Sequence, residues 1–267
     1  MKKTKGAKRT RGKRSGRKKK KLKRISVGPV ALGMAICLLL ALICLPLIRQ
    51  RANEYGAQVP EDSFSYILDI SHHQKSVNWD SLLVMTDAKG RTVRSPGKAV
   101  RVKAPDYVVM KASEGEVYRD ECFAQRWKEA ADKGIRRGAY HFFRAERDPQ
   151  RQAENFAGAV GQLSFRDLPP VLDVETVPPG MKPGEFNDRV LHCLQAIELR
   201  FGRRPIVYAP DSFMTDILDS SIVENYSLWV ARYGREKPLC GNWDYWQFSD
   251  KAVVHGIEGK VDLSVIR

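Results

Sequence analysis

Residues 171–175 read Val-Leu-Asp-Val-Glu, a short apolar run that ends in two carboxylic acids. A run of this length bounded by turn residues predicts a buried β-strand. Because residues i and i+2 of a strand point to the same face, about 6.5–7 Å apart at the backbone, Asp173 and Glu175 are expected to project side by side. A strand buried in an apolar core would not carry two acids without a functional reason.

Seven further runs of the same kind occur along the chain. They are Tyr66–Ile70, Tyr107–Lys111, Gly138–Phe142, Pro205–Tyr208, Leu228–Ala231, Tyr245–Phe248 and Val261–Ser264. Helical patterns separate the earlier runs, at residues 122–134, 149–160, 183–201 and 212–218. This alternation predicts a parallel sheet, and eight strands in about 200 residues predict a small α/β barrel that loses its regular helices near the end.

Two other predicted strands also carry acids, Asp69 and Asp262. Active sites of parallel barrels lie at the C-terminal strand ends, so we expect four carboxyls to converge there and at least one pKa to rise. A protonated acid beside an ionised carboxylate is what glycoside hydrolysis requires. The pair of acids could instead be a metal site or a solvated strand end. No histidines accompany the acids at ligand spacing, so we expect neither a metal nor a cofactor.

Aromatic side chains near the strand ends could stack on sugar rings. We favour a pocket position for Tyr140 and Trp246, and core packing for Trp79, Trp127 and Trp229. Tyr140 and His141 must face opposite sides of their strand, so only one of them can line the barrel. Two features have simple structural interpretations: a loop hydrogen bond for His72 or His73, and a surface ion pair for Lys111 and Glu114.

The positive charge of the chain belongs to one tail. Residues 1–24 hold 15 of the 46 basic residues and no acid, which leaves 31 basic and 31 acidic groups in the remainder and argues against a nucleic-acid-binding protein. Residues 25–48 carry no charge and could span a bilayer. By the positive-inside rule we expect a single-pass signal anchor with a cytoplasmic N-terminus, a linker at 49–62 and an extracytoplasmic domain at 63–267, on the periplasmic or cell-wall side.

Several alternatives to these interpretations stay open. The span could be a cleaved signal peptide, or a lipoprotein signal at Cys44, and the tail could touch anionic lipid or nucleic acid. Residues 86–104, with six basic residues and one acid, are expected to form an inserted solvated loop. Cys122, Cys193 and Cys240 indicate neither a disulfide framework nor a zinc site, although one bridge could form.

Seven stretches of this chain resemble glycoside hydrolase family 25, the Chalaropsis-type lysozymes, which are N-acetylmuramidases. The resemblance covers about residues 64–267 and rests on Asp69-Ile-Ser-His-His-Gln74, Val77-Asn-Trp79, Lys111-Ala-Ser-Glu-Gly115, Gly138-Ala-Tyr-His-Phe-Phe143, Leu172-Asp-Val-Glu175, Trp246-Gln-Phe-Ser-Asp250 and Gly259-Lys-Val-Asp-Leu-Ser264. Family members commonly have Asn where Ser264 stands, which puts one substrate contact in doubt.

The resemblance implies an irregular, TIM-like (β/α)5(β)3 barrel, here preceded by one transmembrane helix. It implies hydrolysis of the β-1,4 bond between N-acetylmuramic acid and N-acetylglucosamine in bacterial peptidoglycan by a monomer. Glu175 would be the general acid, Asp173 would assist it, and Asp69 and Asp262 would complete the acidic cluster. The residues expected to bind substrate are Tyr140, Tyr208, Lys111, Glu114, Gln247 and Trp246. The alternatives are a peptidoglycan-binding scaffold without activity and a hydrolase of another N-acetylhexosamine polymer.

Overall fold

The computed structural model describes residues 34, 36–38, 40, 42, 44, 45, 54–60, 65–234 and 236–267. The chain divides into two units, residues 1–47 and 48–267. The predicted basic tail, 1–24, and most of the predicted membrane span, 25–48, lie outside the described residues. Within the described part of the chain, no helix is long and apolar enough to cross a bilayer.

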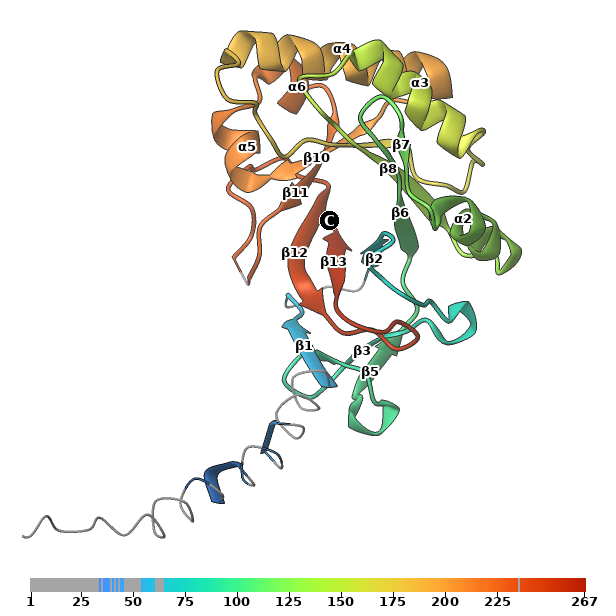
Figure 1. The fold of residues 1–267 in the computed structure, drawn as a ribbon, viewed down its shortest axis with the longest axis vertical. Coiled ribbons are helices and arrows are strands. Elements are labelled where there is room, and N and C mark those ends of the chain that lie inside the picture. Colours follow the sequence, from blue (N-terminus) through green and yellow to red (C-terminus); the bar gives the residue numbers. More distant parts are fainter. Residues whose placement is uncertain are drawn as a thin grey trace, which may run out of the picture. The chain divides into compact units, whose positions relative to one another are not determined.

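Eight strands close into a barrel, as the sequence predicts (Figure 1). In chain order they are β2 (Tyr66–Ile70), β6 (Tyr107–Glu114), β8 (Arg137–Phe142), β9 (Val171–Asp173), β10 (Ile206–Pro210), β11 (Ser227–Ala231), β12 (Tyr245–Ala252) and β13 (Val261–Ile266). Neighbouring strands from β2 to β12 pair in parallel, whereas β13 pairs antiparallel with both β12 and β2 and closes the ring. A short strand, β7 (Tyr118–Arg119), forms a hairpin with β6.

Helices connect the first strands and cover the outside of the barrel. They are α2 (Phe123–Asp132), α3 (Pro149–Val160), α4 (Pro183–Phe201), α5 (Asp211–Asp216) and α6 (Ser220–Val223). Local sequence sets the ends of α3, because Pro149 occupies its first turn and the side chain of Asp148 accepts a hydrogen bond from the Arg151 amide at 2.9 Å. Gly202 ends α4 with a left-handed φ of 62°. Helices α3 and α4 pack against each other (Figure 1).

The apolar residues form two separate layers. The larger lies on the outside of the barrel, where the strands pack against the helices, and includes Phe143, Phe156 and Phe186. The smaller fills the barrel interior with Ile67, Val109, Val171, Ile206, Tyr208 and Trp229. Because side chains alternate along each strand, the residues two positions beyond this inner layer point into the mouth of the barrel.

A second sheet replaces the loop and part of the linker that the sequence analysis expects. It has the order β1-β4-β3-β5, with β1 (Tyr55–Gln58), β4 (Arg91–Val93), β3 (Val84–Thr86) and β5 (Arg101–Lys103), all antiparallel. Two short 3-10 turns, η1 (Trp79–Ser81) and η2 (Pro96–Lys98), lie nearby in the sequence. The solvated-loop prediction for 86–104 is wrong because short strands form there, with Thr92 and Val93 buried in β4, and ion pairs such as Arg91–Asp87 at 2.7 Å neutralise basic residues.

Gly56 allows β1 to pass against the end of β12. A Cβ atom at this position would lie 2.4 Å from both the Val253 amide nitrogen and Thr92 Oγ1. Gly56→Ala should therefore lower the free energy of unfolding by about 1–3 kcal/mol, measured by urea denaturation. Gly184→Ala in α4 is the matched control, because a Cβ atom there would meet nothing within 4 Å, so that change should be neutral or slightly stabilising. Equal effects of the two substitutions would contradict the close approach.

Candidate active site

The four predicted acids meet at one mouth of the barrel. Asp262 on β13 is the Cα partner of Asp69 on β2, and Asp173 ends β9, with Glu175 two residues beyond it. Burial, followed by the charges of Asp262 and Glu175, raises the pKa of Asp69 well above its ordinary value. Burial and the charges of Glu175 and Asp69 do the same to the pKa of Asp173. The mutual effects on these pKa values require the side chains to lie close together.

Burial also raises the pKa values of the other two acids, Glu175 and Asp262. Burial raises the pKa of Glu175, while the neighbouring Tyr208 hydroxyl and the charge of Lys111 act in the opposite direction. Burial, with the charges of Asp250 and Glu175, raises the pKa of Asp262 to about 6. The pKa values of all four acids are therefore raised above their ordinary values.

Lys111 brings positive charge to the edge of this cluster. Its Nζ lies 2.5 Å from Glu114 Oε2, and Arg144 donates to the other carboxylate oxygen of Glu114. Burial alone would raise the pKa of Glu114, but the hydrogen bonds from Lys111 and Arg144 hold that pKa below its ordinary value. The pair is therefore more than a surface contact: the charge of Lys111 also lowers the pKa values of Asp69, Asp173 and Glu175. Arg144 is a contributor that the sequence analysis missed.

Two tyrosines fix the amide of Gln247 on β12. Its Oε1 accepts hydrogen bonds from Tyr208 Oη at 2.8 Å and from Tyr233 Oη at 3.1 Å. The other end of this amide, Nε2, is buried and has no hydrogen-bond partner among the described residues, and the same is true of Asp173 Oδ1. Tyr233 follows β11 in the chain. An aromatic residue beside a strand end is the sequence feature that could have predicted its place in this site.

Tyr140 and Trp246 have different environments. Tyr140 packs with the inner layer, and burial raises its pKa well above the ordinary value, as do the charges of Asp69 and Asp173. His141 points outward, where it contacts Ser113 Oγ at 2.8 Å, so the predicted division between these two residues is confirmed. Trp246 is not in the mouth: it is 1% exposed in the outer layer, and its Nε1 donates to the Arg232 carbonyl at 2.7 Å. It alternates with Gln247, so only Gln247 can face inward.

The loop after Asp69 is held by α2 and the turn before it. His72 Nδ1 lies 2.7 Å from the buried carboxylate of Asp120, which also accepts from the His72 amide at 3.0 Å. Buried Arg126 donates to the carbonyls of Ser71 and Gln74. The expectation that a histidine of this motif makes a loop hydrogen bond is confirmed for His72.

Ser264 and Trp229 lie one layer deeper than the acids. Trp229 Nε1 donates to Ser264 Oγ at 2.9 Å, and both side chains are buried. The hydroxyl therefore pairs with a core tryptophan, in agreement with the core interpretation of Trp229. Among the described residues, no group of three or more His, Cys, Asp or Glu residues is arranged to hold a metal ion, and Cys122, Cys193 and Cys240 are free thiols.

The raised pKa of Asp262 makes stability depend on pH. Below pH 3.8, the ordinary pKa, Asp262 holds its proton in both the folded and the unfolded chain. Between pH 3.8 and about 6 the unfolded chain has released the proton while the folded chain still holds it, so the free energy of unfolding falls as the pH rises. Asp262→Asn should remove this penalty, raising the free energy of unfolding by on the order of 1–3 kcal/mol at pH 7.5 relative to wild type and by much less at pH 3.5.

Urea denaturation at the two pH values measures this difference. Asp188→Asn on α4 is the control, because Asp188 is exposed and its replacement should change the unfolding free energy by less than about 0.5 kcal/mol at both pH values. The same effect of Asp262→Asn at pH 3.5 and pH 7.5 would contradict the raised pKa.

Comparisons with known proteins agree with this geometry. The family model described as glycosyl hydrolases family 25 matches residues 68–257. The uncharacterized protein YegX of Escherichia coli K12 is 30% identical over 80% of this chain and 73% of its own length, and lysozyme M1 of Streptomyces globisporus is 31% identical over 73% and 65%.

Solved structures share the fold. The bacterial lysozyme of Streptomyces coelicolor matches with a TM-score of 0.63 and 28% identity over 78% of this chain and 94% of that protein. A family 25 glycosyl hydrolase from Bacillus anthracis has a TM-score of 0.64 at 21% identity, over 79% and 92% of the two chains, and supports the fold alone. The extent of the family match and the coverage of these relatives show that the chain belongs to glycosyl hydrolases family 25 and is a glycoside hydrolase.

Proposed function

We propose that this chain is a lysozyme-type N-acetylmuramidase that hydrolyses the β-1,4 bond between N-acetylmuramic acid and N-acetylglucosamine in peptidoglycan. The observation that carries the proposal is the pair of buried atoms without partners among the described residues, Asp173 Oδ1 and Gln247 Nε2. The first is an acceptor and the second a donor, which is the complement of an amide group. Both sugars of peptidoglycan carry an acetamido group that could satisfy them, and unsatisfied buried polar atoms are rare without a role.

Glu175 is the proposed general acid. It is half-buried at the end of β9, and its raised pKa favours the protonated form. Its proton passes to the glycosidic oxygen as the bond from that oxygen to the anomeric carbon breaks, and a water molecule then supplies hydroxide to that carbon and returns a proton to Glu175. Asp173 assists by orienting the acetamido N–H or by stabilising the positive charge that develops on the sugar.

The remaining acids and polar residues complete the mouth. The charge of Asp262 raises the pKa of Asp69, and the charge of Asp69 raises the pKa of Asp173, while the charge of Lys111 lowers both. Tyr140, Tyr208 and Gln247 line the proposed sugar site, with Glu114 acting through Lys111. The named lysozyme relatives from Streptomyces support peptidoglycan as the substrate.

We also propose that residues 25–48 anchor the enzyme as a single-pass signal anchor. The 24 residues contain no charged side chain and follow a tail with 15 basic groups. This arrangement favours a cytoplasmic N-terminus and an extracytoplasmic domain, on the side where peptidoglycan lies.

Glu175→Gln should reduce the rate of peptidoglycan hydrolysis by about 10²–10⁴-fold, because the amide cannot donate the required proton. Release of reducing ends from purified peptidoglycan measures the rate, and mass spectrometry identifies the terminal sugar, which should be N-acetylmuramic acid. Glu185→Gln on the exposed start of α4 is the matched control and should retain wild-type activity.

Three outcomes would count against this assignment. Equal rates for wild type and Glu175→Gln would remove Glu175 as the acid. Binding of peptidoglycan without any release of reducing ends would favour the scaffold. Products that end in reducing N-acetylglucosamine would place the cut at the other bond.

Deletion of residues 2–48 should convert a membrane-bound enzyme into one that stays in the supernatant after carbonate extraction and ultracentrifugation. In intact spheroplasts, external protease should digest the domain of the full-length chain. Recovery of a mature chain that begins after residue 48 would instead identify a cleaved signal peptide.

A further inference from the structure

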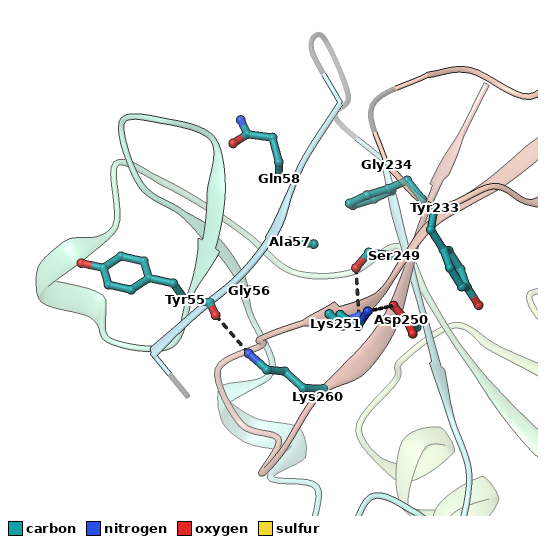
Figure 2. Close-up of a pocket in the computed structure, with 11 residues that line it drawn as sticks. Tyr55, Gly56, Ala57, Gln58, Tyr233, Gly234, Ser249, Asp250, Lys251 and Lys260 are labelled. Atoms are coloured by element: carbon teal, nitrogen blue, oxygen red, sulfur yellow. Dashed lines mark hydrogen bonds and ion pairs between the residues drawn. The ribbon is translucent and has the colours of Figure 1, made fainter. Parts of the chain in front are cut away.

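A groove of about 530 Å³ lies where the second sheet meets the barrel (Figure 2). One wall is β1, and the other is the end of β12 from Phe248 to Lys251 together with Tyr233 and Gly234. Figure 2 shows these two segments facing each other, with Asp250 and Lys251 beside the groove. The β1 wall lies outside residues 68–257, the part of the chain that the family model matches.

The groove borders the mouth of the barrel at two of its lining residues. Tyr233 lines the groove and donates to Gln247, whose amide lies in the mouth. Asp250 lines the groove, and its charge helps to raise the pKa of Asp262. A polymer held at the acids can therefore extend directly into the space between β12 and β1.

The side chains of the groove suit a charged peptide better than a sugar ring. Phe248 is 1% exposed, and the ring of Tyr55 is occupied by Arg91 and Lys98, whose cationic groups lie 4.3 and 4.9 Å from its centroid. Apart from half-exposed Tyr233 at the entrance, the described lining therefore presents no aromatic face for stacking. Its polar groups are the ammonium groups of Lys251 and Lys260, the carboxylate of Asp250, the amide of Gln58, which donates to the Lys89 carbonyl, and the hydroxyl of Ser249, which accepts from the Lys251 amide.

The lysines differ in what they can do. Lys260 Nζ donates to the Tyr55 carbonyl at 3.0 Å and so ties β1 to the segment before β13. Lys251 is 77% exposed, and its contact with Asp250 is long, at 3.8 Å. Its ammonium group can therefore turn toward an incoming anion at little energetic cost. The second edge of β1 pairs with no strand of the described chain, but its Tyr55 carbonyl is held by Lys260 and Gly56 packs closely against Val253.

We propose that this groove binds the peptide stem attached to muramic acid, with Lys251 contacting a stem carboxylate. The proposal rests on the proposed function, because it assumes peptidoglycan in the neighbouring mouth. It makes the second sheet a specificity element that favours glycan strands with intact stems over bare strands.

The test compares two polymers: purified peptidoglycan, and the same material after an amidase has removed the stems. Lys251→Glu should raise KM on the stem-bearing polymer by about threefold to tenfold while leaving kcat and the rate on the bare strands unchanged. The loss should shrink at high salt, because the contact is electrostatic. Lys128→Glu on α2 is the matched control, since its side chain is 76% exposed, and it should behave as wild type on both polymers.

The outcomes separate the two proposals. A change in KM confined to the stem-bearing polymer supports the groove as a stem site. Equal KM changes on both polymers would show that the groove holds the glycan, and no change on either would show that it holds neither; both results overturn the proposal. If wild type cleaves neither polymer, the proposed function itself fails.

Discussion

The antiparallel return of β13 is the constraint on which the site depends. It closes the barrel and makes Asp262 the cross-strand partner of Asp69. Directly opposed residues in a sheet have Cβ atoms about 4.5–5.5 Å apart, and like charges at that distance repel. In a partly dry mouth this repulsion favours one shared proton over two negative charges, so the two acids titrate as a pair. The fold thus builds an acidic site by strand geometry before any loop contributes.

The other carboxyls of the mouth, including the proposed acid Glu175, act on the pKa values of this pair and of Asp173. The charges of Asp69 and Glu175 act on Asp173, and those of Glu175 and Asp262 act on Asp69. Without a countercharge, the mouth would hold its protons more strongly and lack the ionised carboxylate that the reaction needs. Lys111, fixed by Glu114, lowers three of these pKa values and is placed by the same strand, β6, that pairs with β2. Neighbouring strands therefore supply both the acids and the positive charge that lowers their pKa values. The raised pKa of Asp262 lowers the stability of the fold at neutral pH.

The residues that sequence could place are those governed by strand alternation. Asp173, Asp69, Tyr140 and the outward His141 follow from a period of two and from the rule that barrel sites lie at strand ends. The same rule excludes Trp246 once Gln247 is placed inward, because adjacent residues cannot share a face. The sequence alone could not decide which of Trp246 and Gln247 faces inward, because either choice buries the other side chain outside the barrel.

The second sheet could not be predicted from the sequence, for a different physical reason. Its strands are three or four residues long, and its basic residues resemble a solvated loop until their partners, such as Asp87 and Asp106, are seen in space. Its position depends on long-range contacts that no local pattern encodes: Gly56 against Val253, and Lys260 against Tyr55. These contacts set the separation of β1 from β12 and hence the width of the groove. Because these contacts are not part of the pairing between β2 and β13, the width of the groove can change while Asp69 and Asp262 keep their places.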